Sequence, residues 1–355
     1  MPVEVNARAA VLMDSGTGET LMAMNEHEKL YPASVTKIMS MLLIAEAIDN
    51  GTLRLTDKVT AGTNAASKGG SQIWLREGET MTADELLKAT AIYSANDACT
   101  ALGEHIAGSS EAFVDMMNDK AKELSMNDTY FVNCTGLDDD TTEHLTSAYD
   151  VALMSRELLK HKFIMNYTTV WMDSLRGGDT ELVNTNKLVR FYKGTTGLKT
   201  GTTNKAGCCI SATAERDNTH LIAVVMGSPS SADRFEGAKK MLNWGFANYK
   251  TITPEIDKKP ITDVKVIKGV DEKITPVLPE IKPVLIKKGD EKNITQDISE
   301  AVDVEAPVEK GQKLGHITLK CGDNIIGEYS LTAPKAVEKL TVGVIFKRLL
   351  KVFAQ

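Results

Sequence analysis

The chain lacks the long apolar run, the basic block and the cysteine spacing that mark several common protein classes. No stretch of about 18 apolar residues occurs in it, which argues against a membrane-spanning helix. Its net charge is −7 and no Lys/Arg-rich block interrupts it, which argues against nucleic acid as a partner. The five cysteines follow no zinc or redox spacing, and we expect all of them to be unpaired.

The N-terminus also lacks the features of an export signal. The opening residues "MPVEVNARAA" contain neither a basic n-region nor an apolar h-region. The protein is therefore either cytosolic or derived from a longer chain whose signal peptide has been removed. The chemistry that the sequence motifs indicate has to decide between these two interpretations.

The composition of the chain changes near residue 250. Of its 10 prolines, most follow that point, and the long helical patterns stop there. Short alternating apolar runs take their place, at 264–268, 283–288, 303–308, 316–320 and 324–330. We therefore expect a first domain over 1–250, a β-rich domain over 251–340 and an amphipathic segment over 341–355.

The first 250 residues combine strand and helix patterns. Alternating runs on both sides of "SGTG" predict a β-hairpin near the N-terminus. Helical patterns cover 34–49, 82–108 with a break around Ser94, 110–126, 145–161 and 231–249. The segment 197–229 is expected to supply strands. Because strands lie at both ends and helices between them, we predict an α+β fold whose terminal strands share one sheet.

A serine and a lysine lie three residues apart in "YPASVTKIMS", directly ahead of an apolar run. On a helix, Ser34 and Lys37 would share one face, with their Cβ atoms about 5–6 Å apart. Ser34 would lie near the positive end of the helix dipole, and burial would lower the pKa of Lys37. A neutral lysine can accept the proton of a serine, so the pair suits an activated nucleophile. The same spacing also fits an ordinary helix start whose lysine extends to solvent.

Two further short motifs favour the catalytic interpretation. In "YSAND", Ser94 and Asn96 lie at a break between helical segments, where the hydroxyl can relay a proton and the amide can hold a substrate carbonyl. In "LKTGTT", Lys199 and Thr200 can form a carboxylate site. Gly201 beside them would let a substrate backbone approach the strand closely.

In this order, Ser-x-x-Lys, Ser-x-Asn and Lys-Thr-Gly resemble the motif set of penicillin-binding proteins and serine β-lactamases. Longer stretches, including "GSQIWLREGETMTADELLKATAIYSANDA" and "LVNTNKLVRFYKGTTGLKTGTTNKAG", are similar to the low-molecular-mass D-alanyl-D-alanine carboxypeptidases, especially their sporulation-linked subgroup in Gram-positive bacteria. The resemblance covers 7–250 closely and the β-rich domain more loosely. It implies a penicillin-binding or serine β-lactamase-like α+β domain, with an antiparallel sheet that carries helices on both faces, followed by a small all-β domain.

The resemblance also implies roles for the residues of the first two motifs. Ser34 would be the acyl-accepting nucleophile and Lys37 its base. Ser94, in contact with Lys37 and Lys199, would pass a proton to the leaving D-alanine. Asn96 would hold the peptide carbonyl of the substrate. The backbone N–H groups of Ser34 and Thr202 would form the oxyanion hole.

For the third motif, the resemblance implies that Thr200, with Lys199 behind it, binds the terminal carboxylate of the substrate. Arg234 in "SADRFEGAKK" matches an arginine that helps to fix the carboxylate region, but it could equally be a surface arginine that opens a helix. Some family members carry another arginine in the segment that corresponds to "VNTNKL". Here that position is Thr185 or Lys187, so no role is transferred to it.

Three enzyme types share the acylation step: carboxypeptidase, transpeptidase and β-lactamase. A fast β-lactamase needs a base for the deacylating water, and class A enzymes use a glutamate between the second and third motifs. Here "CTGLDDDTTEHLTSAYD" contains Glu143 but not the class A pattern. We therefore rank first a serine-type carboxypeptidase that removes the terminal D-alanine of peptidoglycan stem peptides. A β-lactamase and a non-catalytic β-lactam-binding sensor or scaffold are the alternatives.

The resemblance implies partners and a location as well. Peptidoglycan stem peptides would be the substrates and β-lactam antibiotics covalent inhibitors, with no cofactor and no metal. Because this substrate lies outside the cytoplasmic membrane, we expect an extracytoplasmic, membrane-associated protein whose signal peptide has been removed.

The last residues of the chain contain a candidate segment for membrane contact. In a helix over 342–353, Lys347, Arg348 and Lys351 fall within one arc of about 100°, and apolar residues fill the opposite side. This pattern predicts a helix that lies on a membrane surface. The alternative is a helix that packs on the β-rich domain.

Overall fold

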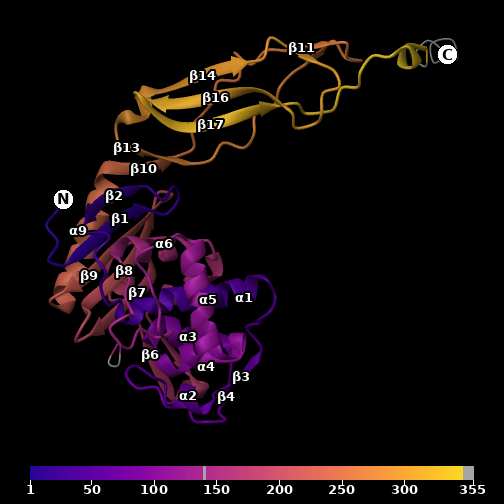
Figure 1. The fold of residues 1–355 in the computed structure, drawn as a ribbon. Helices are drawn as coiled ribbons and strands as arrows, with labels where there is room; N and C mark the ends of the chain where they lie inside the picture. The colour runs from indigo at the N-terminus through magenta and orange to yellow at the C-terminus, as the bar shows by residue number, and fades with distance from the viewer. Residues whose placement is uncertain (139–140, 347–355) are drawn as a thin grey trace. The chain divides into compact units, whose positions relative to one another are not determined.

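The structure, a computed structural model, describes residues 1–138 and 141–346. The chain forms two compact units, with the boundary between Asn248 and Tyr249. Helices and strands mix in the first unit, whereas the second consists mainly of strands (Figure 1).

The first unit is organised around a five-stranded antiparallel sheet with the strand order β2-β1-β9-β8-β7. Its strands are β1 (Ala9–Asp14), β2 (Thr20–Met24), β7 (Thr195–Thr203), β8 (Gly207–Arg216) and β9 (Thr219–Ser228). The predicted N-terminal hairpin is confirmed, with Ala10 opposite Met24. On its other side, β1 pairs with β9 and Val11 lies opposite Val224. The first and last strands of the unit therefore share one sheet, as predicted.

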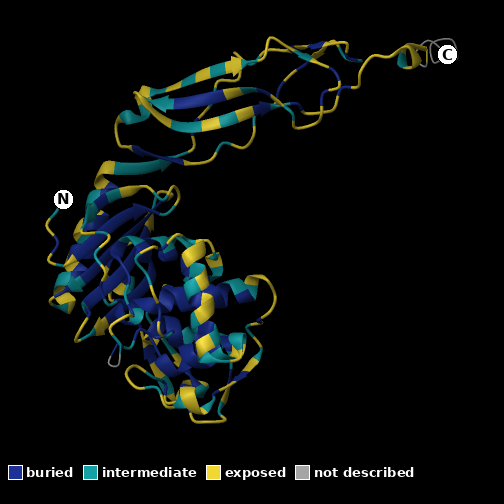
Figure 2. Cartoon of the chain, in the orientation of Figure 1, coloured by how far each residue is buried: buried dark blue, intermediate teal, exposed yellow. Residues whose placement is uncertain are grey.

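Apolar side chains fill both faces of this sheet, because successive residues of a strand point to opposite sides. On β1, Leu12 belongs to the core that α9 (Ser231–Asn248) covers. Its neighbour Val11 belongs to the core on the other face, together with α1 (Lys37–Asp49) and α6 (Ala148–Leu158). Figure 2 shows the inner strands β1, β9 and β8 almost completely buried, whereas the edge strand β2 is more exposed. The predicted sheet with helices on both faces is thus confirmed.

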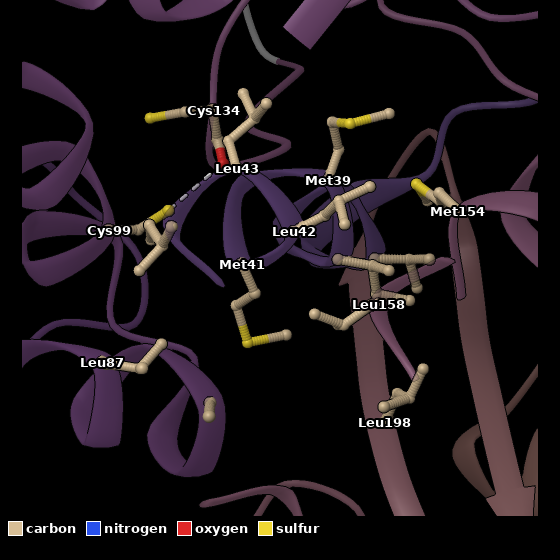
Figure 3. Close-up of a cluster of buried hydrophobic side chains, with 14 of the residues drawn as sticks. Met39, Met41, Leu42, Leu43, Leu87, Cys99, Cys134, Met154, Leu158 and Leu198 are labelled. Atoms are coloured by element: carbon tan, nitrogen blue, oxygen red, sulfur yellow. Dashed lines mark hydrogen bonds between the residues drawn. The ribbon is translucent and has the colours of Figure 1, made fainter. Parts of the chain in front are cut away.

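Helix α1 is apolar on every side, which is the pattern of a helix surrounded by protein. Around it lie α4 (Asn96–Ala107), α5 (Ser110–Glu123), α6 and β7, and α3 (Ala83–Lys88) contributes Leu87 to the same core. Figure 3 shows its side chains among those of the neighbouring elements, with Met39, Met41, Leu42 and Leu43 from α1 and Leu87, Cys99, Met154, Leu158 and Leu198 around them. Lys37 is the first residue of this helix, and its side chain is fully buried in the interior of the unit.

The predicted break around Ser94 is confirmed. Helix α3 ends at Lys88 and a π-helical turn follows over Ala89–Tyr93 before α4 begins at Asn96. Ser94 itself has a φ of 68°, in the left-handed region that non-glycine residues seldom adopt. Such backbone strain is often found at functional sites, where the surrounding structure holds it in place.

Several short elements lie outside the predicted helices and strands of the first unit. Two small antiparallel pairs are β3 (Lys58–Thr60) with β4 (Thr80–Thr82), and β5 (Met172–Leu175) with β6 (Thr180–Val183). The short helices are α2 (Thr63–Ala66), α7 (Met165–Thr168) and α8 (Leu188–Phe191). Segments of three or four residues are too short to establish a periodic pattern, which explains why the sequence does not predict them.

Over residues 249–346, the second unit contains eight strands in small sheets. They are β10 (Tyr249–Ile252), β11 (Val264–Ile267), β12 (Lys273–Ile274), β13 (Val284–Lys287), β14 (Ile294–Glu300), β15 (Asp303–Glu305), β16 (Lys313–Cys321) and β17 (Asn324–Thr332). Each of the five predicted alternating runs overlaps one of them. The sequence misses β14, because its residues alternate between half-buried and exposed and only two of them are aliphatic.

The predicted amphipathic segment is only partly described. Residues 342–346 form the beginning of a helix, in which Val342 and Phe346 are exposed. The cations Lys347, Arg348 and Lys351 lie outside the described residues. Within residues 1–138 and 141–346, no helix has both the length and the apolar character needed to cross a bilayer.

Candidate active site

Ser34 and Lys37 lie at the junction of two helical segments. Ser34 is part of the 3-10 helix η1 (Ala33–Thr36), which follows Pro32, and Lys37 is the first residue of α1. Lys37 Nζ and Ser34 Oγ form a hydrogen bond over 3.0 Å. The three-residue spacing therefore places a serine hydroxyl against the amine of a buried lysine.

Lys37 has no solvent-exposed surface and two further hydrogen-bond partners. Its Nζ donates to Asn96 Oδ1 over 2.6 Å and to the Thr135 carbonyl over 2.8 Å. Burial lowers the pKa of Lys37 from its usual 10.5 to about 8, an effect that Asp97 and two nearby thiols partly offset. At this pKa a substantial fraction of the amine is neutral near physiological pH.

Ser94 and Asn96 follow the π-helical turn and are both buried. Asn96 Nδ2 donates to the Gly69 carbonyl over 2.7 Å, and the Asn96 backbone N–H donates to the Ser71 carbonyl over 2.7 Å. A primary amide has two N–H donors, so one remains for a ligand. In the part of the chain that the structure describes, the Ser94 hydroxyl forms no hydrogen bond, including none to Lys37.

Strand β7 carries the third motif. Lys199 is buried and its Nζ donates to the Thr200 carbonyl over 3.1 Å. Burial, with smaller contributions from the charges of Lys37 and Arg234, holds the pKa of Lys199 well below its usual value. Thr200 Oγ1 donates to Thr185 Oγ1 over 2.7 Å. Of the two candidates for the ambiguous position, Thr185 thus lies at the site.

Gly201 brings strand β7 against the turn that carries Ser34. A Cβ atom at this position would lie 2.8 Å from both the Pro32 carbonyl oxygen and the Ser34 backbone nitrogen. Such distances leave no room for a side chain, so the contact requires glycine. The backbones of Ser34 and of the Gly201–Thr202 segment are consequently neighbours.

Arg234 lies beneath the same strand and not on the surface. It is only 7% exposed and donates to the Gly201 carbonyl and to Thr202 Oγ1, both over 2.8 Å. A third hydrogen bond reaches the Cys209 carbonyl over 3.2 Å on the adjacent strand β8. The alternative of a surface arginine is therefore wrong, and Arg234 holds the Gly201–Thr202 backbone in position.

His144 and Glu143 differ in their surroundings. The Val132 backbone N–H donates to His144 Nδ1 over 3.0 Å, so Nε2 carries the proton that is shared with Thr36 Oγ1 over 2.8 Å. Burial lowers the pKa of His144 to about 4, which keeps the ring neutral. Glu143 is exposed and lines a surface pocket with Lys29, away from the motif residues.

The carbonyl of Thr135 is a contact of Lys37 that the sequence analysis misses. The turn that presents it is closed by Asn133 Oδ1, which accepts from the backbone N–H groups of Thr135 and Gly136 over 3.1 and 2.7 Å. Asparagine followed by glycine three residues later is a turn signal, and "NCTG" contains it. The signal predicts the turn but not its approach to a lysine 98 residues earlier.

Comparison with known proteins decides what kind of site this is. Residues 1–230 match the family model described as D-alanyl-D-alanine carboxypeptidase, and 249–339 match the C-terminal domain of penicillin-binding protein 5. D-alanyl-D-alanine carboxypeptidase DacF of Bacillus subtilis is 42% identical over 346 residues, which cover 96% of this chain and 88% of the relative. The chain belongs to the D-alanyl-D-alanine carboxypeptidase family. It is a serine carboxypeptidase of peptidoglycan, as predicted.

Solved structures agree with the fold of this carboxypeptidase. Penicillin-binding protein 5 from Haemophilus influenzae has a TM-score of 0.83 at 28% identity, covering 96% of this chain and 99% of that chain. Penicillin-binding protein D2 from Listeria monocytogenes in its cefotaxime-bound form has a TM-score of 0.63 at 31% identity, covering 69% and 98%. The penicillin-binding type of α+β domain and the β-rich domain that follows it are therefore confirmed.

Proposed function

We propose that Ser34 is the acyl-accepting nucleophile of this carboxypeptidase and that Lys37 is its base. The observation that carries the proposal is the set of three partners of Lys37 Nζ. A neutral amine has two N–H groups and one lone pair. The Asn96 side-chain oxygen and the Thr135 carbonyl can only accept, so they take the two N–H groups. The lone pair is then directed at the Ser34 hydroxyl, ready to receive its proton.

The remaining motif residues are proposed to act on the substrate. The free N–H of the Asn96 amide suits the peptide carbonyl, and the unpaired Ser94 hydroxyl suits proton transfer to the leaving D-alanine. The backbone N–H groups of Ser34 and Thr202 would bind the oxyanion, and such donors typically contribute about 3 kcal/mol each. The close contact at Gly201 and the hydrogen bonds of Arg234 support this arrangement.

Lys199 and Thr200 are proposed to bind the terminal carboxylate of the substrate. In the free enzyme, the low pKa of Lys199 disfavours its charge. A carboxylate that binds beside it would favour the ammonium form, because an opposite charge within a few ångströms raises the pKa of a lysine. A substrate without a free carboxylate would not restore this charge, which explains a preference for peptide C-termini.

The reaction type can be tested by comparing two substrates. We expect catalytic release of D-alanine from a peptide that ends in D-Ala-D-Ala, and slow hydrolysis of benzylpenicillin. The physical reason is that Glu143, the acidic residue nearest to a class A arrangement in sequence, faces a surface pocket and not the motif residues. Assays of D-alanine and of penicilloic acid would measure the two rates. Rapid penicillin turnover would reverse the assignment, and turnover of neither would favour a β-lactam sensor.

The pH dependence of acylation tests the base. Below the Lys37 pKa of about 8, protonation removes the lone pair, so the second-order acylation rate constant should rise with pH up to about 8 and then level off. In the unfolded chain Lys37 has its usual pKa of 10.5. Between about pH 8 and 10.5 the unfolded chain therefore binds more protons at Lys37 than the folded chain, so the free energy of unfolding should rise with pH. A flat rate profile over pH 6 to 10, measured by stopped flow, would contradict the role of Lys37.

The carboxypeptidase is further proposed to work outside the cytoplasm, on stem peptides at the membrane surface, and to be inhibited by β-lactams. The extracellular position of peptidoglycan supports the location. The cefotaxime- and ampicillin-bound forms of the Listeria relative support the inhibitors. The exposed Val342 and Phe346 are compatible with a C-terminal segment that inserts apolar side chains between lipids.

Vesicle co-sedimentation tests the membrane segment. The chain of residues 1–355 should sediment with vesicles that contain anionic lipid, because its three cations face the headgroups while apolar residues enter the bilayer. A chain that ends at residue 340 should remain in the supernatant. High salt should weaken binding by screening the cations. Equal binding of the two chains would mean that residues 341–355 are not the membrane contact. It would favour the alternative, a helix packed on the β-rich domain.

A further inference from the structure

Trp74 is a large apolar side chain that the fold holds in water. Its residue is 74% exposed, and its φ of 60° lies in the left-handed region that bulky residues rarely adopt. A residue keeps such a backbone conformation only where its surroundings enforce it. Trp74 lies on the loop between α2 and β4, three residues after Ser71, whose carbonyl accepts from the Asn96 backbone.

The loop around Trp74 is fixed on both sides of the indole. The buried carboxylate of Asp97 accepts from the backbone N–H of Ile73 over 3.1 Å and from that of Leu75 over 3.0 Å. The side chains of Ile73 and Leu75 are themselves buried. Trp74 between them must therefore point outward, and its exposure results from an anchored loop rather than a loose one.

A second segment completes a pocket beside the indole. Arg176, at the turn between β5 and β6, donates to the Ile73 carbonyl over 2.9 Å and forms an ion pair with Glu79 at 2.7 Å. Arg176 is also in the left-handed region, with a φ of 54°. The pocket between the two segments has a volume of about 640 Å³. Its lining is Ile73, Trp74, Arg76, Glu79, Arg176, Asp179, Thr180 and Glu181.

This Trp74 pocket lies within reach of the catalytic residues along both of its walls. Trp74 is three positions after Ser71, the partner of the Asn96 backbone, a span of at most about 11 Å. On the other wall, five residues lead from Thr180 along β6 to Thr185, the partner of Thr200, which is at most about 18 Å. A stem peptide of four or five residues spans a similar distance, so a peptide whose C-terminus lies at Ser34 is long enough to extend to the pocket.

The chemistry of the pocket fits a neutral, polar ring. An indole face offers a flat apolar surface to the C–H groups of a pyranose, in the way that aromatic side chains form contacts of large area. Around it stand two arginines and three carboxylates, Arg76, Arg176, Glu79, Asp179 and Glu181. These groups can donate to and accept from hydroxyl and acetamido groups. Their nearly balanced charge favours neither an anionic nor a cationic ligand.

We propose that the Trp74 pocket binds a sugar ring of the glycan strand that carries the stem peptide. This inference rests on the proposed function, since it assigns to the same substrate a second contact remote from Ser34. The ring stacks on Trp74 while its substituents form hydrogen bonds with the surrounding charged groups. The enzyme consequently prefers stem peptides that remain attached to glycan.

Paired substrates test the pocket in the full chain. The value of kcat/KM for D-alanine release would be measured with a free stem pentapeptide and with the same peptide carried on an N-acetylated amino-sugar disaccharide. We expect the native chain to prefer the glycosylated peptide. Trp74→Ala should lower kcat/KM for that substrate by about tenfold, a typical effect of removing an aromatic anchor, and leave the free peptide unchanged. Trp74→Tyr should retain most of the preference.

Phe191→Ala is the matched control, because Phe191 is a 70% exposed aromatic residue outside the pocket. It should behave like the native chain with both substrates. Equal kcat/KM for the two substrates in the native chain would overturn the proposal. So would a parallel loss on both substrates in Trp74→Ala, accompanied by slower acylation with benzylpenicillin, because Trp74 would then act through the catalytic residues.

A binding measurement separates this inference from the proposed function. A peptide-free amino-sugar oligosaccharide, titrated into the native chain, should change the tryptophan fluorescence, and the change should disappear in Trp74→Ala. Binding of the oligosaccharide without any D-alanine release would support the pocket and overturn the proposed function. D-alanine release without oligosaccharide binding or substrate preference would support the proposed function and overturn the proposal for the pocket.

Discussion

Replacing Lys37 with alanine is expected to slow the acylation of Ser34 by about 10²–10⁴-fold, the usual contribution of a general base. Alanine has no lone pair that could accept the Ser34 proton, and in the described chain no other amine forms a hydrogen bond with the Ser34 hydroxyl. The rise of the rate with pH up to about 8 should disappear in the same variant, because the group that titrates there is gone. Stopped-flow acylation with benzylpenicillin measures both effects.

The variant is expected to fold, because the substitution has two opposing effects on the free energy of unfolding. Loss of the amine leaves the Asn96 oxygen and the Thr135 carbonyl without their partner, and an unsatisfied buried acceptor typically costs about 1–3 kcal/mol. At the same time, the substitution removes a buried amine whose desolvation opposes folding. Thermal unfolding would check this balance, with the exposed Lys187→Ala as a control that should change neither rate nor stability. Near-normal acylation in a folded Lys37→Ala chain would move the base role elsewhere, first to Ser94.

Local spacing explains why much of this site can be predicted from the sequence. Ser34 and Lys37 are three residues apart where the 3-10 helix η1 continues into α1, so local helical geometry brings them together. The break at Ser94 and the strand that carries Lys199 also follow from local patterns. The arrangement of these three pieces around one point comes instead from the resemblance to a known family.

Contacts between segments that lie far apart in the sequence cannot be predicted from local sequence patterns. The Thr135 carbonyl approaches Lys37 across 98 residues, and His144 reaches Thr36 across 108 residues. Arg234 is the clearest case: at the start of a helix it has the pattern of a surface residue, yet its partners are carbonyls on β7 and β8. Only the packing of α9 against the sheet buries it.

The same limit applies to the fold. The long strands and helices carry apolar periodicity that the sequence displays, because one or both of their faces are buried. The pair β5–β6, which carries part of the Trp74 pocket, consists of strands of four residues with one buried position each. Its position depends on Arg176 and Glu79, two residues joined across 97 positions of the chain.

The identity of the nucleophile is the central claim, and one covalent adduct tests it. Attack by Ser34 Oγ on the β-lactam carbonyl opens the ring, forms an ester and transfers the serine proton, through Lys37, to the ring nitrogen. No atom leaves, so the chain gains the full mass of the antibiotic. Replacing Ser34 with alanine should abolish the adduct and the release of D-alanine. It should leave the fold intact, since Lys37 retains its other two acceptors.

The measurement is mass spectrometry of the native chain after reaction with benzylpenicillin, first intact and then as a proteolytic digest. The mechanism predicts one penicilloyl group per chain, located on the peptide that contains "YPASVTK" and on Ser34 within it. The Ser34→Ala chain should remain unmodified under the same conditions. An adduct on another residue, Ser94 included, or no adduct on a folded native chain, would contradict the account.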